Sequence, residues 1–328
     1  MNALKLLAPS VVVRAVLVTM IVLAGIVQAQ DWPTKPVRII MPYPAGGGAD
    51  TITRIVGQKL GESLGQPFVI ENRVGANGNI GTEAVVRSAP DGYTLGHGNN
   101  GNITMNPHLY ALGFDPLKDL VPIAMIAANT QLLFVNPEVP VRTVADLIEY
   151  AKARPGQVNY ASAAAGSQSH LAAELFNQRA GTRMVHVPYK GGLPAITDVI
   201  GGRVGIMFGS AATVLPLVKA GKLRGVATTG LQRSAFTPEL PTIAESGFPG
   251  FEVDIWYALF APVGTPVTVI RKLNAEVVRI VGLADVKEAL SKQGAEPVTM
   301  SPESLPEYLR TDSARWGGVV KASGAKVD

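Results

Sequence analysis

Short apolar runs alternate with helical patterns along most of the chain. Residues 37–41 form one such run, and apolar residues then recur at helical spacing between Ile52 and Leu64. This alternation is typical of parallel strands joined by crossover helices, so it predicts an α/β fold.

The same pattern places the remaining elements. The predicted strands are residues 37–41, 68–71, 93–95, 123–127, 131–135, 158–161, 184–187, 204–208 and 223–228. The predicted helices are one that begins near residue 49 and others at 80–87, 144–154, 167–180, 195–200, 213–220, 267–281 and 302–321. Proline and glycine are densest at residues 237–250, which makes that stretch a candidate crossing between two lobes.

The first thirty residues have the features of an export signal. Lys5 and Arg14 are followed by an uncharged apolar run, residues 15–27, and by small residues at a cleavage point near Ala29. That run is short for a membrane helix, which needs about 20 residues. We therefore expect a cleaved signal peptide at residues 1–29 and no stable membrane insertion afterwards; an uncleaved anchor is the alternative.

Composition narrows the protein class. The chain has 328 residues, 47% hydrophobic and 16% charged, and no cysteine, which argues against disordered, coiled-coil and disulfide-stapled proteins. At about 150 residues per domain, its length predicts two domains with a cleft between them. Loss of Lys5 and Arg14 with the signal lowers the formal net charge from +4 to about +2. The other Lys and Arg residues are scattered singly, so no nucleic-acid partner is expected.

The turn at residues 44–48 follows a predicted strand and precedes a predicted helix. Its glycines allow close backbone approach, and the N–H groups of a first helical turn attract anions. The turn is therefore a candidate anion site, with a plain connecting turn as the alternative. Asp50 either supports the helix start or faces a ligand; the first is favoured, because its charge would repel a carboxylate.

A second strand-to-helix junction, residues 160–171, has the same character. Its serines offer hydroxyl donors beside a helix start, although Ser167 alone could be only an N-cap. Residues 187–192 are a third candidate, because Tyr189 and Lys190 stand at a strand end next to two glycines.

Signals for catalysis are weak. The chain contains neither a Gly-x-Ser-x-Gly elbow nor a His-Glu-x-x-His motif, and it has no thiol nucleophile. Its four histidines lack metal-ligand spacing. Ser167 and His170 stand three residues apart without an evident carboxylate partner, which makes a poor triad. We therefore expect no catalytic residues, no metal and no cofactor.

Seven motifs occur in a fixed order, and together they carry a resemblance. They are PYPAGGGAD at residues 42–50, ENRVGANGNIG at 71–81, APDGYT at 89–94, GSQSHL at 166–171, VPYKG at 187–191, LPTIAESG at 240–247 and WYALFAP at 256–262. With these motifs the chain resembles the substrate-binding proteins of tripartite tricarboxylate transporters, also called Bug receptors, over essentially its whole mature length.

The resemblance implies a two-lobed periplasmic binding protein fold, type II-like, with the ligand in the interlobe cleft. Lobe 1 is expected at residues 30–130 and 255–328 and lobe 2 at 131–254, with crossings near 129–131 and 253–255. It further implies a monomeric periplasmic receptor that binds a small carboxylate and delivers it to membrane transporter subunits. A di- or tricarboxylate, an aromatic acid or an acidic amino acid would fit this role.

The resemblance also implies, position by position, which residues of this chain form the binding site. One wall of the cleft is expected to contain Tyr43, Ala45, Gly46, Gly47, Asp50, Asn99 and Asn100. The opposite wall is expected to contain Ser162, Ala164, Gly166, Ser167, His170, Tyr189, Gly191 and Ser210. Two positions depart from the family pattern: Ala164 replaces a usual glycine and changes how closely the second turn approaches a ligand. Gly205 replaces an acidic residue and removes a polar contact.

Two other functions share these features. A receptor that presents its ligand to a sensor kinase would have the same pocket and a different partner. An exported enzyme acting on carboxylates would use His170 or Asp50 as its general base. An aromatic acid could stack on Tyr43, Tyr189 or Trp256, although buried packing is the commoner use of such residues.

Overall fold

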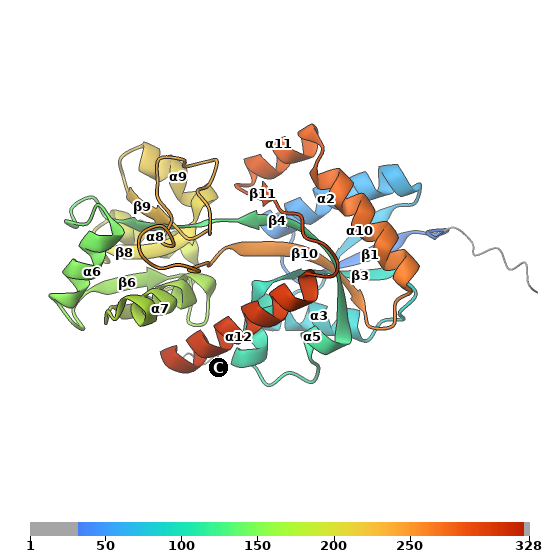
Figure 1. The fold of residues 1–328 in the computed structure, drawn as a ribbon, viewed down its shortest axis with the longest axis horizontal. Coiled ribbons are helices and arrows are strands. Elements are labelled where there is room, and N and C mark those ends of the chain that lie inside the picture. The colour runs from blue at the N-terminus through green and yellow to red at the C-terminus, as the bar shows by residue number, and fades with distance from the viewer. Residues whose placement is uncertain (1–31, 325–328) are drawn as a thin grey trace, which may run out of the picture.

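The computed structural model describes residues 32–324, so the expected signal peptide lies outside the described residues. Two mixed sheets flanked by helices form two lobes side by side (Figure 1). Lobe 1 is built on a six-stranded sheet of order β11-β4-β10-β3-β1-β2, and lobe 2 on a five-stranded sheet of order β7-β6-β8-β5-β9. The chain therefore has the predicted α/β architecture.

Lobe 1 draws its elements from both ends of the described chain. Its strands are β1 (Val37–Met41), β2 (Phe68–Asn72), β3 (Thr94–Asn99), β4 (Leu120–Asn129), β10 (Ile255–Pro262) and β11 (Glu296–Pro297). Its helical segments are α2 (Gly48–Leu64), η1 (Ala76–Gly78), α3 (Asn79–Val86), η2 (Gly101–Met105), α4 (Asn106–Leu109), α5 (Pro116–Asp119), α10 (Val267–Val281) and α11 (Ala284–Lys292).

Lobe 2 is formed by one continuous segment between them. Its strands are β5 (Gln131–Val135), β6 (Asn159–Ser162), β7 (Val185–Pro188), β8 (Ile206–Ser210) and β9 (Arg224–Thr228). Its helices are α6 (Val144–Lys152), α7 (Gln168–Ala180), α8 (Gly192–Ile200) and α9 (Ala211–Lys219). The chain passes from β4 to β5 through Thr130 alone.

Only part of each sheet is parallel. β1 pairs in parallel with β2 and β3, and β6 pairs in parallel with β7 and β8. β10 runs antiparallel to β3 and β4, and β5 runs antiparallel to β8 and β9. Strand β10 was not among the predicted strands. All its residues after Ile255 are buried, so it shows neither polar alternation nor a turn signal at its start.

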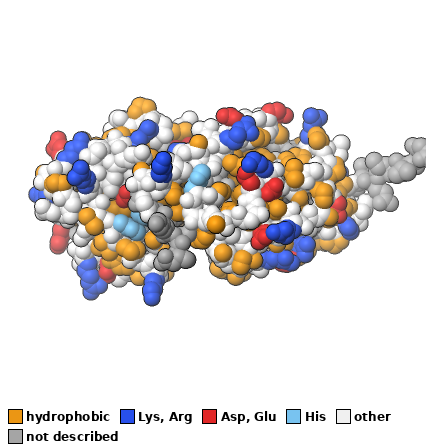
Figure 2. All heavy atoms as spheres, turned by 90° about the horizontal axis from the view of Figure 1, so that it is seen from below, with side chains coloured by type: hydrophobic (Ala, Val, Ile, Leu, Met, Phe, Trp, Pro, Cys, Tyr) orange, Lys and Arg blue, Asp and Glu red, His pale blue; other side chains and the backbone are white. Residues whose placement is uncertain are grey.

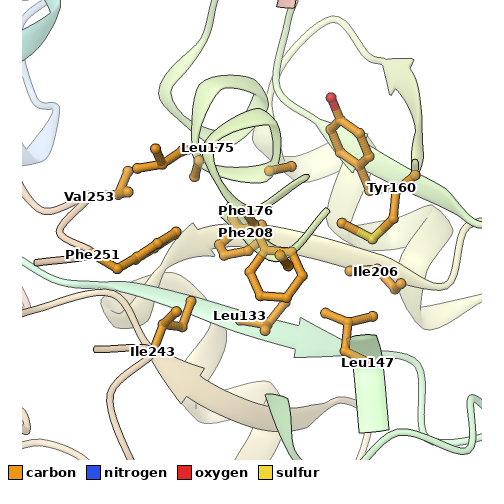
Figure 3. Packing of buried hydrophobic residues seen from close by; sticks show 14 of the residues in the cluster. Leu133, Leu147, Tyr160, Leu175, Phe176, Ile206, Phe208, Ile243, Phe251 and Val253 are labelled. Carbon is orange, nitrogen blue, oxygen red and sulfur yellow. The ribbon is translucent and has the colours of Figure 1, made fainter. Parts of the chain in front are cut away.

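The proline- and glycine-rich residues 237–250 do not carry a crossing, contrary to the expectation. They lie against lobe 2, where the Thr228 N–H donates to the Pro241 carbonyl and the Ile243 N–H donates to the Thr228 carbonyl, both at 2.9 Å. Figure 3 shows Ile243 and Phe251 as part of the lobe 2 core. Prolines prevent regular structure here, but the apolar residues between them are still buried.

Helix α12 (Leu305–Ser323) connects the two lobes a third time. Leu305 and Leu309 are buried in a lobe 1 cluster, whereas Trp316 and Val319 are buried in the core cluster of lobe 2. Figure 1 shows this helix running beneath the junction toward α7. The later part of α12 therefore packs on lobe 2 and its start packs on lobe 1.

Charged groups follow the pattern seen in the sequence. On the face shown in Figure 2, Lys and Arg side chains are interspersed with Asp and Glu and form no continuous stripe. Among residues 32–324 no helix is long and apolar enough to cross a membrane.

Candidate functional site

Two adjoining cavities lie where the lobes meet. The smaller has a volume of about 210 Å³ and the larger about 760 Å³. Ser167 and Gln168 from lobe 2 and Ile255 from β10 line both, so the two form one cleft. The smaller cavity is lined by Tyr43, Asn77, Asn99, Asn100, Gly101, Met105, Asn106, Gly166, Ser167, Gln168 and Ile255. The larger is lined by Gly46, Gly47, Gln131, Ala163, Ser167, Gln168, Ser169, Gly192, Leu193, Ile196, Met207, Gly209, Ser210, Thr213 and Ile255.

Four helices begin at the larger cavity: α2 from lobe 1 and α7, α8 and α9 from lobe 2. The N-cap residues of α2, α8 and α9 are Gly47, Gly191 and Ser210, and none of these helices has a side-chain hydrogen bond at its N-cap. Only α7 is capped, by the Ser167 hydroxyl. Uncapped first turns present N–H groups and the positive end of the helix dipole, which together attract an anion.

Charged side chains are absent from the cleft walls. Within residues 32–324, no Lys, Arg, Asp, Glu or His lines either cavity. The attraction for an anion therefore comes from backbone dipoles, hydroxyls and amides. Nor does any group of three or more His, Cys, Asp or Glu residues in this part of the chain form a metal site.

The turn at residues 44–48 is stabilised by hydrogen bonds to the Asp50 side chain. Its carboxylate accepts the Gly46 N–H at 2.9 Å, and Oδ2 also accepts the Arg54 Nε–H at 2.8 Å. The Asn72 amide donates to the other oxygen at 2.9 Å. Desolvation opposes ionisation, but the hydrogen bonds of Arg54, Gly46 and Asn72 outweigh it and lower the pKa of Asp50 to about 2.

This geometry corrects the expectation that Asp50 forms part of the wall. Its side chain is only 2% exposed and lines neither cavity, so it supports the turn, as the helix-start interpretation proposed. The N–H of Gly46 points to Asp50, whereas Gly47 remains exposed at the cleft.

The second turn is held from below by a pair of stacked histidines. The His170 ring accepts the Gly166 N–H at Nδ1, at 3.0 Å, and stacks on the His186 ring with centroids 3.7 Å apart. The His186 Nε2 lies 2.5 Å from the Ser162 hydroxyl oxygen. Burial lowers the pKa of His170 to about 4, and burial together with the neighbouring His170 lowers the pKa of His186 to about 4, so both rings are neutral at pH 7.

Ser162 and His170 therefore lie beneath the turn rather than in the cavity walls, which corrects their predicted placement. His170 takes part in a hydrogen bond as an acceptor from a backbone N–H, and it does not contact the Ser167 hydroxyl through its ring. The Ser167 hydroxyl instead closes the turn by donating to the Ala164 carbonyl at 2.6 Å.

The other predicted residues divide into two groups. Those at the cavity walls are Tyr43, Asn99, Asn100, Gly166 and Ser167 in the smaller cavity and Gly46, Gly47, Ser167 and Ser210 in the larger. Those outside both walls, contrary to prediction, are Ala45, Ala164, Tyr189 and Gly191.

Two of these four residues have other hydrogen-bond partners, and Trp256, proposed as a stacking surface, is also buried. The Tyr189 hydroxyl donates to Asp198 at 2.8 Å, and the Gly191 N–H donates to the Ala163 carbonyl at 2.8 Å. Trp256 is 2% exposed, and its indole N–H donates to Asp312 at 3.1 Å, so it cannot stack on a ligand in the cleft.

At Gly205, the second departure from the family pattern, an added Cβ would stand 3.0 Å from a methyl carbon of Val139. The position is packed within lobe 2 and does not line the cleft.

The prediction missed two sets of wall residues. One is a group of amides: Asn106 donates to the Asn77 carbonyl at 2.9 Å and to Asn79 at 2.6 Å, and Asn77 and Asn106 both line the smaller cavity. The recurrence of asparagine between positions 99 and 106 was the available signal. The other set is apolar, with Leu193, Ile196 and Met207 in the larger cavity, and such residues cannot be told from core residues by sequence pattern.

Comparison with known proteins identifies close relatives. The family model of the tripartite tricarboxylate transporter family receptor matches residues 52–325. BugT of Bordetella pertussis strain Tohama I is 37% identical over 332 residues, covering 100% of both chains. The resemblance found in the sequence is thereby confirmed.

Solved structures give the same result. Rpa4515 of R. palustris with adipate is 38% identical, with a TM-score of 0.75, covering 90% of this chain and 100% of that one. MatC of Rhodopseudomonas palustris with bound malate is 31% identical, with a TM-score of 0.71, covering 88% and 100%. A solute-binding protein from Polaromonas with no ligand is 27% identical, with a TM-score of 0.80, covering 88% and 99%.

Proposed function

Because the chain belongs to the tripartite tricarboxylate transporter family of receptors, we propose that it captures a small carboxylate in the periplasm and delivers it to the membrane subunits of such a transporter. The observation that carries this proposal is the convergence of uncapped helix starts from both lobes on one cleft without charged walls. A carboxylate in that position would receive N–H groups of both lobes at once. Relatives bound to adipate and malate support this ligand class.

The two lobes, residues 30–130 with 255–328 and residues 131–254, would close on the ligand. Contacts with both walls exist only in the closed form, so a ligand shifts the population toward it by its difference in affinity.

A thermal-shift screen of the mature protein, refolded to remove copurified ligand, tests the proposal. At about 1,000 times its dissociation constant a true ligand adds roughly 4 kcal/mol to the free energy of unfolding. At about 2 to 4 °C per kcal/mol this raises the melting temperature by many degrees. Solution X-ray scattering should show a smaller radius of gyration with that ligand. A flat response to all carboxylates, or an unchanged radius with a bound one, would contradict capture between closing lobes.

A further inference from the structure

We infer that the cleft selects a carboxylate with an extended apolar body, a linear chain or a ring, over a compact hydroxylated tricarboxylate. This inference rests on the proposed function and names the ligand class of the same site. It follows from what the walls contain and from what they lack.

An apolar strip lies beside the helix starts in the larger cavity. Leu193 is the second residue of α8 and is 73% exposed, although it is a large apolar side chain. Ile196, three residues on and so on the same helix face, lines the cavity with Met207 of β8. Ile255 adds apolar surface from β10. An apolar ligand body placed here removes this surface from water.

The positive electrostatic potential at the cleft walls is weak. Each uncapped helix start provides about half a positive charge, screened where it meets water. With no Lys or Arg among the wall residues of the described chain, two or three helix starts balance one carboxylate well. Three carboxylates of one compact ligand would bring more negative charge than these dipoles balance, and their desolvation would remain uncompensated.

The smaller cavity provides a place for the far end of a long ligand. It opens to the larger one past Ser167, Gln168 and Ile255, and it carries the amides of Asn99 and Asn100. Amides both donate and accept, so they can bind a terminal hydroxyl, amide or second carboxylate. The cleft as a whole is polar at its ends and apolar along one side, which matches an extended ligand.

Isothermal titration calorimetry of the mature protein with two homologous series tests this inference. One series is the straight-chain monocarboxylates from acetate to octanoate, and the other is the α,ω-dicarboxylates from succinate to suberate; citrate and tricarballylate are the comparison. We expect the dissociation constant to fall about fourfold per added methylene, equivalent to about 0.8 kcal/mol, until the apolar strip is covered. Citrate and tricarballylate should bind more weakly than a dicarboxylate of similar size.

The Leu193→Ser variant sharpens the test, because an exposed side chain can be changed without disturbing the core. It should reduce the gain in affinity per added methylene. Leu231→Ser is the matched control: Leu231 is 51% exposed, belongs to lobe 2 and lines neither cavity. It should leave the slope unchanged.

The outcomes separate this inference from the function on which it rests. An affinity that is independent of chain length, or highest for citrate, would overturn the apolar-body inference while leaving carboxylate capture intact. An unchanged slope in Leu193→Ser would overturn the assignment of the apolar strip. Absence of binding by every carboxylate, in both series and in the thermal-shift screen, would contradict the proposed function itself.

Discussion

The two turns that face each other across the cleft have similar shapes but are supported by opposite chemistry. The lobe 1 turn before α2 is held by the ionised Asp50 with Arg54 and Asn72. The lobe 2 turn before α7 is held by the neutral rings of His170 and His186. In each case one backbone N–H of the turn is bound from beneath, so the neighbouring N–H groups are fixed in direction.

Because one turn is supported by a carboxylate and the other by histidines, acid affects the two walls differently. The pKa of Asp50 is lowered to about 2, so its charge persists in mild acid. The pKa of each histidine is lowered to about 4, so those rings charge first as the pH falls. A protonated His170 could no longer accept the Gly166 N–H, because both ring nitrogens would be donors. As the pH falls, the lobe 2 turn therefore loses its supporting hydrogen bond before the lobe 1 turn does.

The largest expected effect concerns the exposed glycine of the lobe 1 turn. Gly47→Val should weaken carboxylate binding roughly 100-fold, about 2.7 kcal/mol, because the side chain would occupy the space of the ligand. Gly47 has a φ of −74°, and a Cβ there would meet only the Pro44 carbonyl, at 3.7 Å, so the fold should be preserved. Gly46, with a φ of +82°, would be strained by the same change.

Calorimetric titration measures this effect, and Gly113→Val is its control. A Cβ at Gly113 meets nothing within 4 Å, and the residue lines neither cavity. Equal affinity in Gly47→Val and Gly113→Val would show that the lobe 1 turn does not face the ligand, and only the lobe 2 wall would remain.

The next largest expected effect follows from removal of the Asp50 carboxylate, which supports the lobe 1 turn. Asp50→Ala should lower the free energy of unfolding by about 2 kcal/mol, because it leaves the Gly46 N–H without its acceptor and removes one of the two hydrogen bonds that the Asn72 amide donates. Urea unfolding measures this. Glu83→Ala removes the exposed partner of Arg87 and should cost no more than about 0.5 kcal/mol. Similar losses in both variants would mean that Asp50 contributes no more than a surface ion pair.

A pH-dependent effect distinguishes the two walls. The folded protein holds His170 and His186 at a pKa of about 4 and the buried His97 of lobe 1 at about 3, below their unfolded value of 6.5, so unfolding takes up protons in this window. Stability should therefore fall as the pH drops from 6.5 to 4, by about 1.4 kcal/mol per pH unit for each histidine. In His186→Gln the fall should be about two-thirds as steep, because His170 and His97 still take up protons on unfolding; urea unfolding at several pH values measures this. An unchanged slope would remove His186 from the support of the lobe 2 turn.

The smallest expected effect on stability concerns Asp254, which lies at the crossing between the lobes and belongs to neither wall. Asp254 precedes β10, and the hydroxyls of Thr130 and Thr229 donate to its carboxyl group at 3.3 and 3.1 Å. Burial, with Glu252 and Glu296 nearby, raises the pKa of Asp254 to about 7 from an unfolded value of 3.8. The folded protein then binds a proton that the unfolded chain has lost, so this contribution to stability declines as the pH rises from about 4 to 7.

Asp254→Asn should abolish that decline and change stability by no more than about 1 kcal/mol at pH 5, where the native group is already neutral. The two pH slopes have opposite signs, so a double variant with His186→Gln separates them. A decline of unchanged steepness in Asp254→Asn would assign the proton to another group.

The sequence predicted the elements whose signals are local. β1, β5 and α10 have the predicted bounds: a glycine turn follows β1, Asn136 and Pro137 end the short apolar run of β5, and α10 has a clear helical periodicity. Strand β10 was missed because it is buried along almost its whole length. Asp50 and Arg54, one helical turn apart, could have been recognised as a pair from spacing alone.

Residues brought together from distant segments could not be predicted in this way. His170 and His186 come from α7 and β7, and only the folded sheet stacks them. Leu193 stands at a helix start, where an apolar residue is read as core, yet it is exposed to the cleft. Sequence position therefore could not separate residues that line the cleft from those, such as Asp50 and His170, that support the turns behind it.

The course of α12 has a practical consequence for observing the molecule at work. The first described residue, Trp32, packs against Phe68 and Tyr93 in lobe 1, whereas the far end of α12 buries Val319 in lobe 2. The two chain ends are thus attached to bodies whose separation the ligand would alter. A donor fluorophore fused before Trp32 and an acceptor fused after α12 should report occupancy as a change in energy-transfer efficiency, with no internal labelling site to engineer.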